Sequence, residues 1–246
     1  MHLLEDHHPG LSPLARKLLE RTGRRQEPAG PRIPTELLTV PDRTGTGRRV
    51  PAPLELVTAR EGFAQRLGGL RYTVRRSTPG VPGEQRESVS EWNWDLGTAV
   101  WPDPAGGWYF EWTGELVSSP VRYLAHTDGR VGVEAGDGVF REIASSTTHL
   151  IESHAVMDAV AGWDPWPIEA DGHAVAGRLD GLTEVAEASG PMLGWRMSDV
   201  VAVMEFREWS NQVPRAPRAF MWSRGEEGRR RLHDATRAAR PGGRDC

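Results

Sequence analysis

Four short segments rich in aromatic and β-branched residues follow one another between residues 107 and 143. They are GWYFEW (107–112), VRYLAH (121–126), GRVGVEA (129–135) and VFREI (139–143). Between them, Asp128-Gly129 and the GDG sequence at 136–138 favour the tight turns of β-hairpins. Strands joined by such short turns are antiparallel neighbours. The chain is therefore predicted to be an α+β protein built on an antiparallel sheet meander flanked by helices.

A helix is expected after the last of these strands, over residues 145–161. Successive helical residues are about 100° apart, so His149 and Glu152 are expected to face solvent, and His154 and Asp158 to lie beside the buried stripe. His154 and Asp158 have the spacing of a contact within one helix. Because the two polar pairs point in nearly opposite directions, they cannot bind one ion. The helix is predicted to be structural, and no metal or cofactor is expected.

Two amphipathic helices are predicted before the meander. The first spans residues 11–21, with Ser12 as its N-cap and Pro13 at its first position. The second spans residues 54–67, ends at Gly68-Gly69 and leads into the strand LRYTV. Residues 22–54 are rich in Pro, Gly and Arg and are expected to form a linker or a wrapping segment.

The C-terminal third is predicted to contain both helices and strands. LTEVAEASGP (182–191) indicates a short helix and RAFMW (218–222) a strand, while DVVAVMEF (199–206) fits a strand or a buried helix, with the helix preferred. The last helix follows this strand, and Ser223 and Glu226 have the spacing of a capping box. Its buried face is expected to consist of Gly228, Leu232, Ala235 and Ala239.

Charge is unevenly distributed along the 246 residues. The net charge is +6 over residues 1–83, −15 over residues 84–213 and +5 over residues 214–246. An acidic surface attracts basic partners and speeds their association. The single cysteine, Cys246, excludes a disulfide within the chain and a thiolate zinc site. No apolar run has the length of a membrane span and no signal-peptide segment is evident, so a cytoplasmic protein is expected.

Three segments follow one another in a fixed order: FAQRLGGLRYTV (63–74), then after an irregular acidic stretch YLAHTDGRVGV (123–133), and then FREIASSTTHLIE (140–152). This series resembles the SUKH superfamily of bacterial immunity proteins. It implies an α+β domain that binds and blocks a toxin, typically a nuclease, and is not an enzyme. The domains expected are an N-terminal extension (1–54), a SUKH-like domain (55–166) and a C-terminal α/β extension (167–246).

The partner-binding residues are expected in the acidic and aromatic region between residues 91 and 134. Carboxylates steer a basic partner, and aromatic side chains supply large contacts. The candidates are Glu91, Trp92, Trp94, Asp95, Glu111, Trp112, Glu115, Asp128 and Glu134. The predicted partner is a basic toxin domain, and no catalytic residue is predicted.

Two other functions stay open from the sequence. A hydrolase could use His149, Glu152 or His126 with Asp128, although the sequence has no nucleophile elbow, HExxH motif or phosphate loop. A nucleic-acid-binding protein could use the arginine-rich helix at the C-terminal end.

Overall fold

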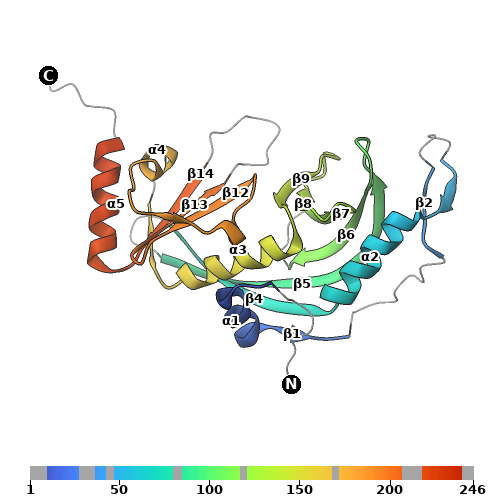
Figure 1. The fold of residues 1–246 in the computed structure, drawn as a ribbon, viewed down its shortest axis with the longest axis horizontal. Coiled ribbons are helices and arrows are strands. Elements are labelled where there is room, and N and C mark those ends of the chain that lie inside the picture. Colours follow the sequence, from blue (N-terminus) through green and yellow to red (C-terminus); the bar gives the residue numbers. More distant parts are fainter. Residues whose placement is uncertain are drawn as a thin grey trace. The chain divides into compact units, whose positions relative to one another are not determined.

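The computed structural model describes residues 10–27, 37–42, 47–79, 85–116, 121–167, 172–206 and 218–239. The chain divides into two compact units, each described here by itself. Unit 1 consists of residues 1–74 and 90–150, and unit 2 consists of residues 75–89 and 151–246. Helices and antiparallel strands occur in both (Figure 1). The predicted α+β class is therefore confirmed, and the predicted domain limits at residues 54 and 166 stay a prediction.

A seven-stranded sheet has the order β1-β4-β5-β6-β7-β8-β9. Most of it belongs to unit 1, while residues 75–79 of β4 and 85–89 of β5 belong to unit 2. From β5 onwards each strand pairs antiparallel with the next one along the chain, which is the predicted meander. The strands are β1 (Arg24–Arg25), β4 (Leu70–Pro79), β5 (Gln85–Pro102), β6 (Trp108–Glu115), β7 (Arg122–His126), β8 (Val131–Glu134) and β9 (Arg141–Ala144).

The long strand β5 differs from the irregular acidic stretch that the resemblance implied at this place. Its pairing with β6 shifts register between Asn93 and Leu96 and again between Leu96 and Val100. Such irregularities insert extra residues into one strand and interrupt the alternation of apolar and polar positions. The period of two that marks a strand in sequence is therefore broken twice in this segment.

Aromatic side chains form the core of unit 1. On β6 the buried residues Trp108, Phe110 and Trp112 alternate with more exposed ones. Phe63 belongs to α2 (Leu54–Leu67), the helix predicted at these positions, and its ring lies 5.5 Å from that of Phe110 and 6.1 Å from that of Trp112. Helix α2 therefore covers the face of the sheet that carries the tryptophans (Figure 1).

The N-terminal helix is confirmed, and residues 22–54, predicted as a linker or a wrapping segment, contain three short strands that the sequence did not predict. Helix α1 (Pro13–Thr22) begins after Ser12, whose hydroxyl accepts a hydrogen bond from the Ala15 N–H at 3.2 Å. The linker contains β1 and an antiparallel pair, β2 (Thr39–Pro41) with β3 (Arg49–Pro51). These strands have two or three residues each, too few to show a period.

Unit 2 contains a five-stranded antiparallel sheet with the order β10-β14-β13-β12-β11. Trp195 and Trp222 stack in its core with ring centroids 5.6 Å apart. Their indole N–H groups donate to the Ser153 hydroxyl and to the Ser77 carbonyl, each at 2.9 Å. The strands are β10 (Asp164–Trp166), β11 (Thr183–Glu184), β12 (Leu193–Met197), β13 (Val201–Phe206) and β14 (Arg218–Ser223).

In unit 2 the helix predicted at 182–191 is wrong, and of the two alternatives for residues 199–206 the strand, not the preferred helix, is present. Residues 201–206 form β13, the middle strand, in which Val201, Ala202, Val203 and Met204 are all buried. Because consecutive strand residues point to opposite faces, this burial means that both faces of β13 are covered, and a strand of this kind has no alternating pattern. Residues 182–191 contain β11 and only one turn of 3₁₀ helix, Ala186–Ala188.

The C-terminal helix α5 (Gly225–Ala239) packs on its predicted face. Gly228, Leu232 and Ala235 are buried, and Leu232 and Ala235 contact the core beside α4 (Gly172–Ala176). A Cβ atom at Gly228 would lie 2.2 Å from the Val200 carbonyl oxygen, so the close approach of α5 to the sheet requires glycine. The helix begins two residues later than the predicted cap, Ser223, which is instead buried at the end of β14.

Helix α3 (Thr147–Val160) is present, and His154 and Asp158 are buried, in agreement with their predicted position beside the apolar stripe, but Glu152 differs from its prediction. Glu152 is buried and does not face solvent. Asp158 forms an ion pair with Arg75, at 3.2 Å, which the sequence did not predict. Every residue from Leu150 to Val156 is buried, so the assumption of a single apolar stripe fails for this helix. Burial also lowers the pKa of His154 well below its usual value.

Candidate functional site

The three tryptophans proposed as partner anchors belong to the core of unit 1. Trp92, Trp94 and Trp112 are at most 3% exposed, and the Trp94 and Trp112 rings stack with centroids 4.4 Å apart. Their side chains cannot reach a partner while unit 1 is folded. This part of the predicted site is therefore corrected, because large aromatic residues on strands are buried against the covering helix.

Two of the predicted carboxylates, Asp95 and Glu134, are also buried. Asp95 accepts a hydrogen bond from the Gly69 N–H at 3.0 Å and lies 3.4 Å from the Arg71 guanidinium. It therefore fixes the end of α2 against the sheet and is corrected from a binding residue to a structural one. Glu134 has a different position, at the wall of a pocket, and keeps a place in the site.

The predicted acidic residues Glu91 and Asp128 lie at the surface in ion pairs within unit 1. Glu91 accepts from Arg24 at 2.7 Å, and Asp128 accepts from Arg130 at 2.7 Å. A partner must compete with these arginines for both carboxylates. Exposed ion pairs contribute about 0–1 kcal/mol each, so the competition costs little.

Glu111 and Glu115, both on β6, lie on opposite faces of the sheet. Residues that pair directly across antiparallel strands share a face. Glu111 pairs with Leu124, whereas Glu115 pairs with the buried Trp92. The alternation reverses at Gly114, which has φ +75°, and the Glu115 carboxylate accepts a hydrogen bond from the hydroxyl of the core residue Tyr123 at 3.4 Å. Of these two glutamates, only Glu111 therefore lies on the face of the sheet away from α2, which is called the outer face below.

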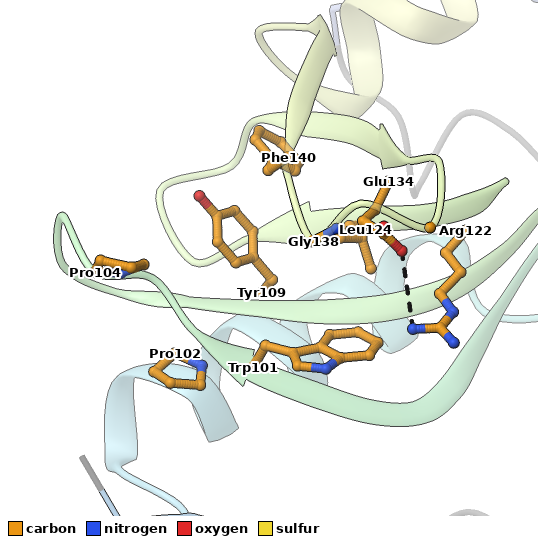
Figure 2. A pocket seen from close by; sticks show the side chains of 10 residues that line it. Trp101, Pro102, Pro104, Tyr109, Arg122, Leu124, Glu134, Gly138 and Phe140 are labelled. Atoms are coloured by element: carbon orange, nitrogen blue, oxygen red, sulfur yellow. Dashed lines mark hydrogen bonds and ion pairs between the residues drawn. The ribbon is translucent and has the colours of Figure 1, made fainter. Parts of the chain in front are cut away.

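That outer face carries a pocket of about 390 Å³ (Figure 2). Its walls include three aromatic side chains and two prolines, and its floor includes Leu124. Trp101 and Phe140 lie at opposite sides in Figure 2, with Tyr109 on the side of Phe140. The rings of Tyr109 and Phe140 stack with centroids 4.6 Å apart. The lining residues are Trp101, Pro102, Pro104, Tyr109, Arg122, Leu124, Glu134, Gly136, Gly138 and Phe140.

One acidic and one basic side chain line this pocket. The Glu134 Oε1 atom accepts a hydrogen bond from the Gly138 N–H at 2.8 Å, and its Oε2 atom lies 3.8 Å from an Arg122 Nη1 atom. The Arg122 guanidinium lies over the Trp101 ring, 5.7 Å from its centroid. Arg122 is 55% exposed and the Glu134 side chain only 9%. The carboxylate is therefore held in place, while the guanidinium lies at the solvent edge.

No family model, curated protein or solved structure matches this chain. We therefore argue function from the chemistry of the site. Within the described ranges no group of three or more His, Cys, Asp or Glu side chains is placed to bind a metal ion. No helix among the described residues has both the length and the apolar character needed to cross a membrane.

A polar cluster next to the pocket joins the β5–β6 turn to the β7–β8 turn. The Tyr109 hydroxyl donates to Asp103 at 2.6 Å. The buried His126 ring has Nε2 3.0 Å from the Gly106 carbonyl oxygen and Nδ1 2.8 Å from Asp128. Both ring nitrogens thus contact groups of the same two turns. The histidine named as a hydrolase candidate therefore has a structural position.

The hydrogen bond between Asp103 and Tyr109 shifts the pKa of both groups. Burial opposes ionisation of Asp103, but the hydrogen bonds from Tyr109 and from the Ala105 N–H outweigh it and hold the pKa of Asp103 below its usual value. Burial, together with the hydrogen bond to Asp103, raises the pKa of Tyr109 well above its usual value. The cluster therefore contains an ionised Asp103 and a neutral Tyr109 at pH 7.

Replacement of Asp103 by asparagine is expected to change how stability depends on acid. A carboxyl with a depressed folded-state pKa stabilises the fold above its unfolded pKa of about 4, and this contribution is lost as the pH falls through the folded value. At pH 6 the variant should be about 1–2 kcal/mol less stable. When urea unfolding is measured between pH 6 and pH 2, the difference in free energy of unfolding between the variant and the natural protein should decrease below pH 4. Parallel curves would contradict the assignment, and Tyr109→Phe should reproduce part of the effect.

The arginines of α5 form contacts within unit 2. Arg229 pairs with Asp164 at 3.1 Å, Arg230 pairs with Glu227, and Arg231 donates to the Asp180 carbonyl. Nucleic-acid binding uses lysines and arginines that neutralise phosphates, and here three of them are engaged by groups of their own unit. Because these pairs are exposed, a phosphate could displace them at little cost, and the alternative of nucleic-acid binding through this helix stays a prediction.

The candidate residues taken from the sequence omitted most of the pocket. Trp101, Tyr109, Arg122 and Phe140 were not among them, whereas Glu134 was. The signal for Tyr109 was present in GWYFEW, because strict alternation on one strand puts it opposite the buried Trp108 and Phe110. Its position beside Trp101 depends on the irregular pairing of β5 with β6, which the sequence does not show.

Proposed function

We propose that this chain is a cytoplasmic immunity protein or antitoxin-like protein that binds a basic partner through the outer face of the unit 1 sheet. The partner expected is a toxin domain, of the nuclease type that the SUKH resemblance implies. Binding blocks the partner, and the chain itself catalyses no reaction. The observation that carries the proposal is the position of Glu111 beside an aromatic pocket, on the face of the sheet away from α2.

The charge of the outer face supports a basic partner. Strand pairing places Glu111 with Leu124, Arg122 with Glu134, and Glu142 with Gly132 on this face. Three carboxylates thus accompany Arg122. A second guanidinium, that of Arg130, lies over the Phe140 ring at 5.7 Å, and it is paired with Asp128 at 2.7 Å and lies 3.8 Å from Glu142. Glu111 has no ion-pair partner among the residues that the structure describes, so a cation from a partner can approach it without displacing another group. Complementary charge of this kind mainly raises association rates and selects partners.

The aromatic pocket supplies the contact area that charge alone does not. Binding energy in protein interfaces is concentrated in a few side chains that fill pockets and are surrounded by polar residues. Here the pocket walls include Trp101, Tyr109, Phe140 and the Glu134 carboxylate, and strand pairing places Glu111 and Glu142 on the same face. The pocket is therefore proposed as the centre of the interface, and Glu111 as part of its rim.

Capture of the partner from the native host is the direct test. The tagged protein is expected to retain a basic protein at low salt and to release it as the salt concentration rises. The toxin activity of the retained protein, assayed with and without the chain, should be inhibited. Recovery of an acidic protein, or of nucleic acid that is lost when the arginines of α5 are replaced, would contradict the proposal.

Glu111→Lys is expected to slow association with the captured partner by about 5- to 10-fold at low salt, because it reverses a charge at the proposed interface. Glu115→Lys is the matched control. It makes the same change of charge on the same strand but on the opposite face, and it should slow association less than about 2-fold. Stopped-flow kinetics at two salt concentrations give both values. Equal effects of the two variants would place the interface elsewhere.

A further inference from the structure

We infer that the pocket on the outer face accepts an arginine side chain of the partner, with its guanidinium between the aromatic walls and against the Glu134 carboxylate. The inference rests on the proposed function and names the chemical group that the site recognises. It follows from three features of the pocket: its aromatic walls, the Glu134 oxygen that accepts no hydrogen bond from Arg122, and the position of Arg122.

The aromatic rings in the walls can stack on a flat cation, and the Arg130 guanidinium already lies over the Phe140 ring, 5.7 Å from its centroid. A guanidinium is planar and stacks on aromatic faces, with an attraction that grows when water is excluded. Trp101 lies at one side of the pocket, and the stacked pair of Tyr109 and Phe140 lies at the other (Figure 2). The Tyr109 hydroxyl is directed to Asp103, so it is committed to that carboxylate and the ring remains as a wall.

Glu134 provides the charge that an arginine side chain requires. One of its oxygens is fixed by the Gly138 N–H at 2.8 Å. The other lies 3.8 Å from Arg122, beyond the distance of a hydrogen bond. A guanidinium in the pocket can approach this oxygen at about 2.8 Å and form the charge-assisted bond that Arg122 does not make. The buried position of the carboxylate strengthens such a bond.

Arg122 is a guanidinium of the chain itself that contacts the pocket. Its guanidinium lies over Trp101 and faces Glu134, but it reaches them from the solvent edge and is more than half exposed. It therefore competes weakly for the place of an incoming guanidinium. Removal of Arg122 should strengthen binding of an arginine side chain, whereas it should weaken binding of any acidic group.

An acidic ligand fits the pocket less well. Arg122 is the single cationic side chain that lines it, and the fixed Glu134 carboxylate would repel a second anion. The acidic residues on the same face add to this repulsion at a distance. Arginine, not glutamate or phosphate, is therefore the chemistry that the observations favour.

The test uses the ¹⁵N-labelled full chain and small probes in place of the partner. N-acetylarginine amide is expected to shift the Trp101 indole N–H and Gly138 amide signals, while N-acetylcitrulline amide, its neutral isostere, should shift them at least 5-fold less at equal concentration. Glu134→Gln should weaken the arginine response at least 5-fold. Glu142→Gln, an equal charge change on the same face outside the pocket lining, should leave it within 2-fold. Arg122→Ala, at an exposed position, should strengthen it.

Three results would overturn the inference: equal responses to the arginine and citrulline probes, a stronger response to N-acetylglutamate amide, or loss of the arginine response in Arg122→Ala. The outcome is separable from the proposed function. Capture of a basic partner whose affinity is unchanged by Glu134→Gln, with no response to the probe, refutes the arginine site alone. A specific probe response without any basic partner in the host refutes the proposed function alone.

Discussion

Trp94→Ala is expected to lower the free energy of unfolding of unit 1 by about 3–5 kcal/mol, the range for removal of a buried tryptophan. Trp94 is fully buried, and its ring contacts those of Trp112, Phe63 and Tyr72 at centroid distances of 4.4, 5.9 and 6.4 Å. Alanine removes all three contacts at once. The cavity lies between a helix and a sheet, which cannot both move inward to fill it.

Two further variants separate the core from the proposed binding surface. Trp94→Phe keeps a ring and removes an indole N–H that has no acceptor among the described residues, so it should cost much less than alanine. Trp101→Ala, the same chemical change on the outer face, should cost about 1 kcal/mol and should instead abolish the response to the arginine probe. Urea unfolding followed by circular dichroism measures the three costs. A loss below 1 kcal/mol for Trp94→Ala would make this residue a candidate surface anchor again.

The elements that the sequence predicted well are those whose signals are local. Turn residues at 128–129 and 136–138 delimit the strands of the meander, and the glycines at 68–69 end α2. The cap at Ser12 and the buried face of α5 likewise depend on residues three or four positions apart in the sequence. Hydrogen-bonding and packing within such short stretches depend little on the rest of the fold.

Errors occurred where the rest of the fold determines the environment. β13 lies in the middle of its sheet with both faces covered, so its apolar run does not distinguish a strand from a helix. The pattern of α3 predicts a surface helix with one apolar stripe, yet Glu152, Ser153 and His154 are buried in succession. Only neighbours distant in the sequence create these environments.

The candidate site was predicted by region more successfully than by residue. An acidic and aromatic surface between residues 91 and 134 contains Glu111 and Glu134, but the tryptophans chosen with them point into the core. The sequence does not show which face of the sheet each glutamate of β6 occupies, because a positive φ at Gly114 reverses the alternation of side chains on this strand. A single residue thus decided that Glu111 and Glu115 lie on opposite faces.

Asp158 is the second position at which a large effect is expected, because its buried carboxylate joins α3 to β4 within unit 2. The carboxylate accepts hydrogen bonds from the Arg75 backbone N–H at 3.0 Å and from the Arg75 guanidinium at 3.2 Å. The sequence predicts a contact between Asp158 and His154 on the same helix. A pair of that kind contributes only about 0.2–0.5 kcal/mol, so the two assignments predict different costs.

Asp158→Ala should therefore lower the free energy of unfolding by about 2–3 kcal/mol, because it leaves the Arg75 backbone N–H without its acceptor and removes a charge-assisted bond. Asp158→Asn keeps an oxygen for that N–H and should cost about half as much. Asp164→Ala is the matched control, since Asp164 is an exposed aspartate of the same unit that pairs with Arg229 and should contribute at most about 0.5 kcal/mol. Urea unfolding at pH 7 should give the largest loss for Asp158→Ala, a smaller one for Asp158→Asn and the smallest for Asp164→Ala. A cost for Asp158→Ala no larger than that of the control would show that the link between α3 and β4 does not stabilise unit 2, and that the contact within the helix was the better interpretation.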